Sequence, residues 1–160
     1  MSERSRILFL CTGNCFRSQM GEAILRHVDP VRFEALSAGS QPAGFIHPLV
    51  LEVLEEMHIP VIDQYSKSWA EFVGQRIDLL ITVCNDAAEE VCPVWPDRPP
   101  TVHWPLPDPS FHPGSFDDRR AAARRVAERL LLKTRRLAAL DWQNHDADAL
   151  RTELEAISEL

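Results

Sequence analysis

The fold is indicated first by the stretch RILFLCTGNCFRS, residues 6–18. Residues 6–11 form a short apolar run that ends at a turn containing Gly13, a pattern typical of a buried strand. Residues 18–28 then carry apolar side chains at helical spacing, which predicts a helix. A buried strand that passes through a short loop into a helix is the repeating unit of α/β folds, so this stretch predicts a parallel sheet.

The alternation of strands and helices continues along the chain. We expect further strands at residues 33–38, 78–84 and 101–106, and further helices at residues 48–58, 87–91 and 117–140. Short buried strands that alternate with helices predict a parallel sheet covered on both faces. We therefore expect an α/β fold with a small, doubly wound, four-stranded parallel sheet flanked by helices. In such sheets ligands lie beyond the carboxyl ends of the strands, where Cys11, Cys84 and Asp108 would emerge.

The length of 160 residues is that of one domain. We assign residues 1–140 to the body of this domain and residues 141–160 to a C-terminal helical extension of it. The extension is acidic, and Leu150, Leu154 and Ile157 follow helical spacing. This pattern predicts a helix that docks on the body or on a partner.

The charge balance excludes several classes of function. The chain has 17 basic and 24 acidic residues, a formal net charge of −7, which opposes the binding of nucleic acid and of anionic membranes. Most of the basic residues between Arg119 and Arg136 are expected on a solvated helix face. No apolar run approaches the ~20 residues of a membrane span, and the N-terminus lacks a secretory signal, so we expect a cytoplasmic protein. An anionic substrate would need a local positive site.

Such a site is predicted in the loop between the first strand and the first helix, where a Cys-x5-Arg-Ser spacing joins Cys11 to Arg17 and Ser18. A loop that wraps onto a helix N-terminus points successive backbone N–H groups inward and forms a cup for an anion. Arg17 would grip a tetrahedral oxyanion through two parallel hydrogen bonds. Cys11, at the base of this positive cup, is expected to be a thiolate and a nucleophile at neutral pH. The predicted oxyanion-binding residues are Thr12, Gly13, Asn14, Cys15, Phe16, Arg17 and Ser18.

Two side chains of the loop have further expected roles. Ser18 would donate a hydrogen bond to the Cys11 thiolate, and Asn14 would lock the loop through side-chain hydrogen bonds. The alternative interpretation is that Cys11 is a buried core thiol at a strand end. The glycine, arginine and serine at this spacing favour the catalytic interpretation.

The segment FLCTGNCFRSQMGEAIL, residues 9–25, resembles the phosphate-binding loop of the low-molecular-weight protein tyrosine phosphatases. It is still more similar to the arsenate reductases built on that fold. The resemblance continues through residues 37–39, 82–92 and 103–109, and it covers about residues 6–135. It implies a low-molecular-weight phosphatase-like fold for the predicted sheet and helices.

The resemblance also implies a general acid. Asp108 lies in an Asp-Pro pair just after the last predicted strand. In both families an aspartate so placed protonates the leaving oxygen while the cysteine attacks. The alternative is that Asp108 is only a turn residue, since Asp-Pro is common in turns. The presence of the Cys11 loop favours the acid.

The chain has four cysteines, and the second pair separates the two families. A phosphatase needs no thiol beyond its nucleophile, whereas the reduction of arsenate to arsenite takes two electrons, which a dithiol supplies when it becomes a disulfide. The resemblance to thioredoxin-coupled arsenate reductases implies that Cys84 attacks Cys11 and that Cys92 then attacks Cys84. The resulting Cys84–Cys92 disulfide would be reduced by thioredoxin, or by glutaredoxin with glutathione.

The spacing of this pair has a geometric consequence. Residues 84 and 92 would lie about 12 Å apart on an intact helix. A disulfide needs Cα atoms within roughly 7 Å, so the segment must unwind or loop when it is oxidised. Two other interpretations stay open for the pair, namely structural thiols, or a zinc site with His103 as a further ligand.

The chain departs from the family pattern at three places. Cys15 does not directly precede Arg17, and it is either a spectator or a thiol that protects Cys11 by forming a disulfide with it under oxidation. The interval between the relay thiols is one residue longer. Lys67 stands where some arsenate reductases have a carboxylate that binds potassium, and its ammonium would replace the ion, so we expect no metal and no cofactor. The other potassium ligands are matched by Asn14, Glu22 and Ser37.

We therefore expect an arsenate reductase with the catalytic residues Cys11, Arg17, Asp108, Cys84 and Cys92. The alternative is a low-molecular-weight protein tyrosine phosphatase, which would hydrolyse phosphate monoesters through a Cys11 phosphoenzyme and would not need the second cysteine pair. A third class is a redox-sensing or interaction domain that keeps the anion loop but has no turnover.

Overall fold

The computed structural model describes residues 4–83, 99–142 and 147–160. The central sheet has four parallel strands: β1 (Ser5–Cys11), β2 (Phe33–Gly39), β3 (Leu79–Thr82) and β4 (Thr101–His103). Their order across the sheet is β2-β1-β3-β4. The chain therefore moves outward from β1 first to one side and then to the other, as in doubly wound folds. The prediction of a small four-stranded parallel sheet is confirmed.

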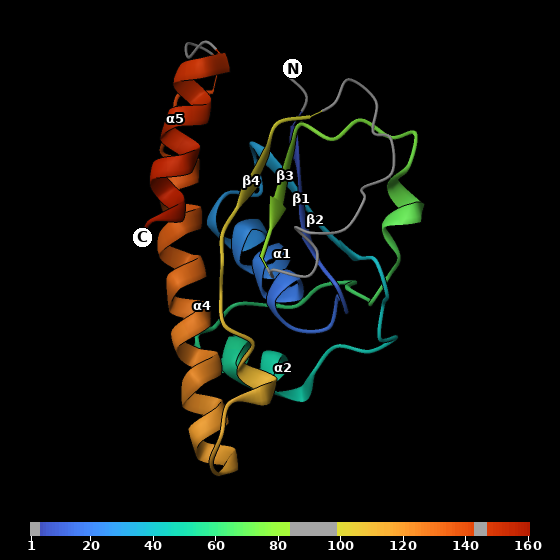
Figure 1. The fold of residues 1–160 in the computed structure, drawn as a ribbon, viewed down its shortest axis with the longest axis vertical. Helices are drawn as coiled ribbons and strands as arrows, with labels where there is room; N and C mark the ends of the chain where they lie inside the picture. The colour runs from blue at the N-terminus through green and yellow to red at the C-terminus, as the bar shows by residue number, and fades with distance from the viewer. Residues whose placement is uncertain (1–3, 84–98, 143–146) are drawn as a thin grey trace.

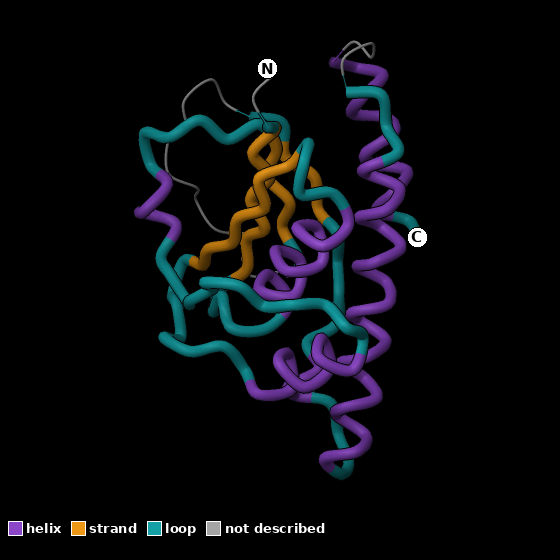
Figure 2. The backbone as a smooth tube through the Cα atoms, turned by 180° about the vertical axis from the view of Figure 1, so that it is seen from behind, coloured by secondary structure: helices purple, strands orange, loops and turns teal. Residues whose placement is uncertain are grey.

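Helices flank this sheet. The described residues form the helices α1 (Arg17–Val28), α2 (Pro48–Glu56), α4 (Phe116–Ala138) and α5 (Ala147–Ser158), and the 3-10 turns η1 (Trp69–Phe72) and η2 (Pro109–Phe111). Figure 1 shows α4 and α5 as a long pair on one side of the sheet and η1 on the other side, and Figure 2 shows the same arrangement from behind. Contacts with β1, β2 and α4 place α1 between the sheet and α4. None of the helices in the described ranges combines the length and the apolar character of a membrane span.

β1 is the central strand of the core. Its residues 7–11 are buried without interruption, because the strand has a neighbour on each edge and both sets of alternate side chains are covered. Phe9 packs edge-on against Trp104, with ring centroids 6.1 Å apart. The Phe9 ring also lies so close to Gly21 of α1 that a Cβ there would be 2.6 Å from it. This close approach brings the start of α1 directly over the end of β1.

The fourth strand differs most from its prediction. We expected it at residues 101–106, but it ends at His103. Pro105 and Pro107 have no N–H to donate, so they cannot continue the ladder of hydrogen bonds. The Trp104 N–H still donates to the Thr82 carbonyl at 2.8 Å, but the prolines that follow end the pairing, and the segment leads into η2. The strand predicted at 78–84 is present as β3, which begins at Leu79 and ends at Thr82, so it is shorter than expected. Residue 84 and the helix predicted at 87–91 lie outside the described residues.

The long helix predicted at 117–140 is present as α4 and begins one residue earlier. A capping box fixes its start, because Ser115 Oγ accepts from the N–H of Asp118 at 3.2 Å and the Asp118 carboxylate accepts from the N–H of Ser115 at 2.8 Å. Two aspartates in the first turn and two arginines in the last turn match the helix dipole. These local signals explain why the sequence located this helix well.

The C-terminal helix α5 packs on α4 and β4. Leu154 is fully buried and Ile157 is 5% exposed, as their helical spacing suggested. Lys133 of α4 is an exception to the expected solvated face, because it is fully buried and its Nζ donates to the carbonyls of Ile157 at 3.1 Å and of Ser158 at 3.0 Å. Burial lowers the pKa of Lys133 from 10.5 to about 8, with the Arg129 guanidinium acting in the same direction and Glu159 opposing it.

Replacing Lys133 by Met is expected to remove a pH dependence of stability. The pKa of Lys133 is about 8 in the folded protein and 10.5 in its ordinary state, so the unfolded chain binds more protons between these pH values. Raising the pH from about 8 to about 10 should therefore increase the free energy of unfolding of the parent relative to that of Lys133→Met. Urea denaturation of both proteins at the two pH values measures this change, and a difference that stays constant would contradict it.

Candidate active site

The loop between β1 and α1 turns its backbone carbonyls outward. The hydrogen bonds that hold them run from the N–H groups of Gln41, Ala43 and His47 to the carbonyls of Thr12, Gly13 and Cys15, at 2.9, 2.8 and 2.9 Å. In a trans peptide the N–H points opposite to the C=O, so the N–H groups that follow these carbonyls point inward. One of them, the N–H of Asn14, donates to Cys11 Sγ at 3.2 Å. The loop is therefore a cup lined with backbone N–H groups, which favours an anion.

Cys11 lies at the base of this cup and is 3% exposed. Its Sγ is 2.7 Å from Ser18 Oγ, in addition to the 3.2 Å contact with the Asn14 N–H. Asn14 Nδ2 donates to Ser18 Oγ at 2.8 Å, which leaves the hydroxyl proton of Ser18 to point at the sulfur. Hydrogen bonds donated to the sulfur favour its anionic form. The surroundings of Cys11 are thus those of a thiolate nucleophile.

Asn14 holds the loop in a backbone conformation that few residues adopt. Its φ of 45° lies in the left-handed region, where asparagine is enriched. Its side chain is fully buried, and its Oδ1 accepts from Gln19 Nε2 at 3.0 Å and from the N–H of Lys67 at 2.8 Å. Gln19 Nε2 also donates to the Asn14 carbonyl at 3.1 Å. These bonds fix the unusual conformation on which the inward N–H groups depend.

Arg17 is the first residue of α1, and its guanidinium reaches across to the segment that follows β4. Its Nη1 donates to the carbonyl of Leu106 at 2.9 Å, and its Nη2 lies 3.4 Å from Asp108 Oδ2. Its Nε is buried and has no hydrogen-bond partner among the described residues. A buried donor without a partner is costly, and an oxyanion in the cup would satisfy it. Arg17 is thus held in place on one side by the carbonyl and presents Nε as a further donor.

Asp108 stands at the mouth of the cup. Its Oδ1 accepts from the N–H of Ser110 at 3.0 Å and from the hydroxyl of Ser110 at 2.6 Å, so it caps η2. Its Oδ2 faces Arg17, and its side chain is 27% exposed. Asp108 is therefore a turn residue and a member of the cluster at once. A carboxyl group in this position can pass a proton to a group that leaves the cup.

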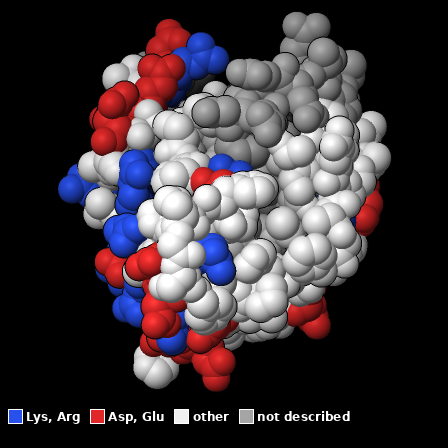
Figure 3. All heavy atoms as spheres, turned by 60° about the horizontal axis from the view of Figure 1, so that its bottom comes forward, with Lys and Arg blue, Asp and Glu red and all other residues white. Residues whose placement is uncertain are grey.

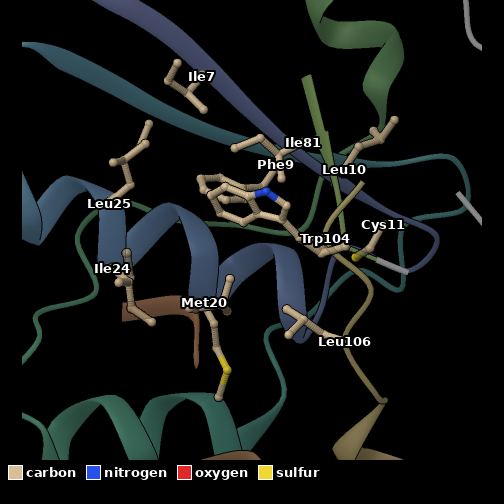
Figure 4. Close-up of a cluster of buried hydrophobic side chains, with 14 of the residues drawn as sticks. Ile7, Phe9, Leu10, Cys11, Met20, Ile24, Leu25, Ile81, Trp104 and Leu106 are labelled. Atoms are coloured by element: carbon tan, nitrogen blue, oxygen red, sulfur yellow. The ribbon is translucent and has the colours of Figure 1, made fainter. Parts of the chain in front are cut away.

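Two aromatic side chains near the loop have packing roles. Trp104 is fully buried against Phe9, as Figure 4 shows. The His47 ring lies 4.8 Å from the Phe16 ring, and its Nδ1 accepts from the N–H of Leu49 at the start of α2. Burial lowers the pKa of His47. These residues support the cup from outside.

Cys15 differs from Cys11 in its surroundings. It is partly buried and is a free cysteine. Burial raises the pKa of the Cys15 thiol, and the Asp108 carboxylate adds to the rise, while Arg17 opposes it. The thiol therefore stays protonated at neutral pH, and a protonated thiol is a weak nucleophile.

A buried carboxylate lies behind the cup. Glu22 of α1 accepts from Ser37 Oγ at 2.6 Å and from Arg26 at 2.8 Å. The Lys67 ammonium lies 3.8 Å from Glu22 Oε1 and donates to the carbonyl of Tyr65 at 2.8 Å. Burial lowers the pKa of Lys67, and Glu22 opposes this change. Among the described residues no group of three or more His, Cys, Asp and Glu side chains is arranged to hold a metal.

The charged side chains are unevenly distributed around this end of the molecule. Figure 3 brings the lower end of Figure 1 forward, where α2 and η2 lie. Basic and acidic side chains gather along the side formed by α4, while much of the remaining visible surface is uncharged. On α4, Arg120 pairs with Glu52 of α2 at 3.4 Å, and Arg124 pairs with Glu128 at 3.1 Å. The positive charge available to an oxyanion is therefore local and comes from Arg17 and the loop.

The structure brings together Cys11, Arg17 and Asp108, together with the loop residues between the first two. Two partners of this cluster were not predicted from the sequence, the Gln19 side chain and the Leu106 carbonyl. A sequence signal for Gln19 exists, since it is a polar residue next to the apolar stripe of α1, and the structure shows it fully buried. A backbone carbonyl carries no such signal in the sequence.

The predicted relay thiols, Cys84 and Cys92, lie outside the described residues. The last described residue before them is Val83, whose N–H donates to the carbonyl of Leu10 at 3.0 Å. The chain therefore leaves β3 beside the end of β1, next to the residue that precedes Cys11.

Comparison with known proteins identifies the family of the chain. The family described as low molecular weight phosphotyrosine protein phosphatase matches residues 6–139. An arsenate reductase of Halalkalibacterium halodurans is 34% identical over 124 residues, which cover 78% of this chain and 88% of the relative. The arsenate reductase of Bacillus subtilis is 31% identical over 128 residues, or 80% of this chain and 91% of the relative. The chain belongs to the low molecular weight phosphotyrosine protein phosphatase family.

Solved structures of both kinds resemble this fold. A thioredoxin-dependent arsenate reductase of Corynebacterium glutamicum superposes with a TM-score of 0.64 at 31% identity, over 86% of this chain and 64% of that chain. The present chain thus corresponds to less than two thirds of that protein. A low molecular weight protein tyrosine phosphatase of T. tengcongensis superposes with a TM-score of 0.64 at 25% identity, over 79% of this chain and 92% of that chain.

Replacing Gly39 by Ala is expected to disrupt the cup. A Cβ at this end of β2 would lie 2.5 Å from the Thr12 carbonyl oxygen and 2.8 Å from that of Cys11, so the loop would have to move. We expect a lower unfolding temperature and a loss of phosphate binding, measured by calorimetric titration. The neighbouring Ser40→Ala is the control, because it adds no atom and its buried hydroxyl has no partner among the described residues. Parent-like phosphate binding by Gly39→Ala would show that the close approach is not needed.

Proposed function

We propose that this chain reduces arsenate to arsenite, with Cys11 as the nucleophile and a relay of two further thiols. The observation that carries the proposal is the meeting of Cys11, Arg17 and Asp108 around a cup of backbone N–H groups. This arrangement suits a tetrahedral oxyanion, and relatives named arsenate reductase are 31–36% identical in sequence to this chain. The presence of Cys84 and Cys92 in the sequence supplies the two thiols that a reductase needs beyond the nucleophile.

The first step takes place in the cup. Arsenate is bound by the N–H groups of the loop and by Arg17, and the Cys11 thiolate attacks the arsenic atom. A sulfur–arsenic bond forms and an arsenic–oxygen bond breaks. The leaving oxygen takes a proton from Asp108 and departs as water. The arsenic atom is not yet reduced at this stage.

The second step transfers the electrons. The Cys84 thiolate attacks the Cys11 sulfur, so a disulfide forms and the sulfur–arsenic bond breaks. The electron pair of that bond stays on arsenic, which leaves as arsenite. The Cys92 thiolate then attacks the Cys84 sulfur and releases the Cys11 thiolate. One Cys84–Cys92 disulfide is formed for each arsenate that is reduced, which balances two electrons.

An external thiol donor closes the cycle by reducing this disulfide. Thioredoxin is the proposed donor, because the similar Corynebacterium glutamicum protein is described as thioredoxin-dependent. Glutaredoxin with glutathione is the alternative donor. Such a cycle needs a reducing compartment, so the proposed location is the cytoplasm. Residues 1–140 would form the reductase domain, with residues 141–160 as its C-terminal extension.

A phosphatase is the second candidate function. The family description names phosphotyrosine protein phosphatases, and Cys11, Arg17 and Asp108 suffice for hydrolysis of a phosphate monoester through a Cys11 phosphoenzyme. This activity would not need Cys84 or Cys92. The two functions therefore differ in their dependence on the second pair of cysteines.

Replacing either relay thiol is expected to stop turnover. In a coupled assay with arsenate, thioredoxin, thioredoxin reductase and NADPH, the parent should consume NADPH, whereas Cys84→Ser and Cys92→Ser should fall to the background rate. Each variant lacks one of the two thiols that form the disulfide, so the two electrons cannot pass from thioredoxin to arsenate. The control is stoichiometric alkylation of Cys11 in both variants, which shows that the cup is intact. Hydrolysis of an aryl phosphate at the parent rate by both variants, without arsenate turnover in the parent, would establish the phosphatase instead.

Arsenate turnover is expected to be independent of potassium, because the Lys67 ammonium lies beside Glu22. Rates measured in potassium and in tetramethylammonium buffers should agree. Lys67→Met leaves Glu22 without this cation and should weaken oxyanion binding several-fold, with partial recovery in potassium. Tyr65→Phe is the matched control, because it keeps the carbonyl that accepts from Lys67. A parent rate that depends on potassium would contradict the role assigned to Lys67.

A further inference from the structure

The C-terminal helix lies outside the part of the chain that matches the family, which ends at residue 139. It is nevertheless built into the core. Leu154 is fully buried, Ile157 is 5% exposed, and the helix contacts both α4 and β4. A helix with this much buried apolar surface is part of the folded body. Its position beside β4 places it next to the strand that leads to Asp108.

Lys133 fastens α5 to α4. Its Nζ donates to the carbonyls of Ile157 and Ser158, which belong to the last turn of α5. Carbonyls in the last turn of a helix have no partner within the helix, and the dipole there favours a cation. Lys133, which is fully buried, supplies both a hydrogen-bond donor to these carbonyls and a positive charge at the end of the helix. The interaction therefore fixes the end of α5 at one point on α4.

The same ammonium reaches toward Trp104. The distance from Lys133 Nζ to the centroid of the indole ring is 5.8 Å, within the range of a cation–π contact. Trp104 is fully buried, its ring packs on Phe9, and its backbone N–H donates to the Thr82 carbonyl at 2.8 Å. Lys133 thus contacts the Trp104 ring, which packs on Phe9 of β1, while the Trp104 backbone is bonded to β3.

Trp104 begins the segment that completes the cup. This segment, residues 104–108, carries the Leu106 carbonyl that holds Arg17 and ends at Asp108. It runs beside α4 to η2, as Figures 1 and 2 show, and η2 contacts α4. Pro105 and Pro107 fix φ within it, which limits the conformations open to the backbone between Trp104 and Asp108.

We propose that Lys133 is a positioning residue, which clasps α5 and thereby holds the segment 104–108 where its Leu106 carbonyl orients Arg17 toward the oxyanion. The inference rests on the proposed role of Arg17 in oxyanion binding. It assigns a purpose to the C-terminal extension, which is to stabilise the wall of the active site that carries the Leu106 carbonyl and Asp108. Lys133 itself does not touch the oxyanion.

The test compares Lys133→Met with Thr134→Val in the full chain. Met keeps the length of the side chain but cannot donate to the α5 carbonyls. Thr134 is the matched control, since it is the next residue on α4, is fully buried, and its hydroxyl donates only within its own helix, to the Leu131 carbonyl at 3.1 Å. The probe is inorganic phosphate, and the readout is its protection of Cys11 against iodoacetamide.

We expect the Kd for phosphate to rise about tenfold in Lys133→Met, in line with the cost of small displacements in binding sites, and to be unchanged in Thr134→Val. The alkylation rate of Cys11 without phosphate should stay within about twofold of the parent, because the bonds from Ser18 and Asn14 come from other elements. A general loosening of the fold would change both quantities. Leu154→Ala loosens α5 without altering Lys133, so it should also raise the Kd for phosphate and leave the alkylation rate nearly unchanged. This variant replaces Lys133→Met in the test if Lys133→Met does not fold.

A parent-like Kd in Lys133→Met and Leu154→Ala would overturn the inference and leave the proposed function standing. Equal changes in the Kd and in the alkylation rate would also overturn it, since they would indicate a general structural effect. If phosphate did not protect Cys11 in the parent, the oxyanion site and the proposed function would fail together with the inference.

Discussion

The outward turn of the carbonyls in the loop after β1 is the constraint on which the rest of the site depends. It turns the following N–H groups inward, and that of Asn14 donates to the Cys11 sulfur. The turn requires a left-handed residue, and Asn14 adopts this conformation because its side chain is fully buried and hydrogen-bonded. It also requires external donors, which the segment with Gln41 and Ala43 supplies. An anion site is thus built largely from backbone groups, with geometry set by neighbours far away in the sequence.

The electrostatics of the site follow from this construction. The chain carries a net charge of −7, yet the cup presents donors and one arginine. The carboxylate of Glu22, close behind the loop, is surrounded by Ser37, Arg26 and Lys67. Because opposite charges within a few ångströms offset each other, this carboxylate does not oppose an anion in the cup. The electrostatic field at the buried Cys11 sulfur is therefore locally positive, although the protein as a whole is acidic.

The wall opposite the loop, the segment 104–108, is organised differently, because the Trp104 N–H is the last that donates to β3 before Pro105 and Pro107 end the ladder. Its position comes from side-chain packing around Trp104 and from η2 resting on α4. The position of such a segment depends on the elements that pack against it. The C-terminal helix covers this region, so the extension and the chemistry are connected through the core rather than through direct contact with substrate.

From the sequence alone, the strand–loop–helix order, the helix α4 and the nucleophile loop could be predicted, because apolar periodicity, caps and the Cys-x5-Arg-Ser spacing are local patterns. The predicted fourth strand was too long, since prolines end a ladder that apolar content alone would continue. The burial of Lys133 could not be predicted, because a basic residue on an arginine-rich helix looks solvated until another helix covers it. The bond from Arg17 to the Leu106 carbonyl joins residues 89 positions apart, and only the folded sheet brings them together. The sequence determined which groups carry the chemistry, and the tertiary structure decided where they meet, because hydrogen bonds to backbone atoms depend on position and not on residue type.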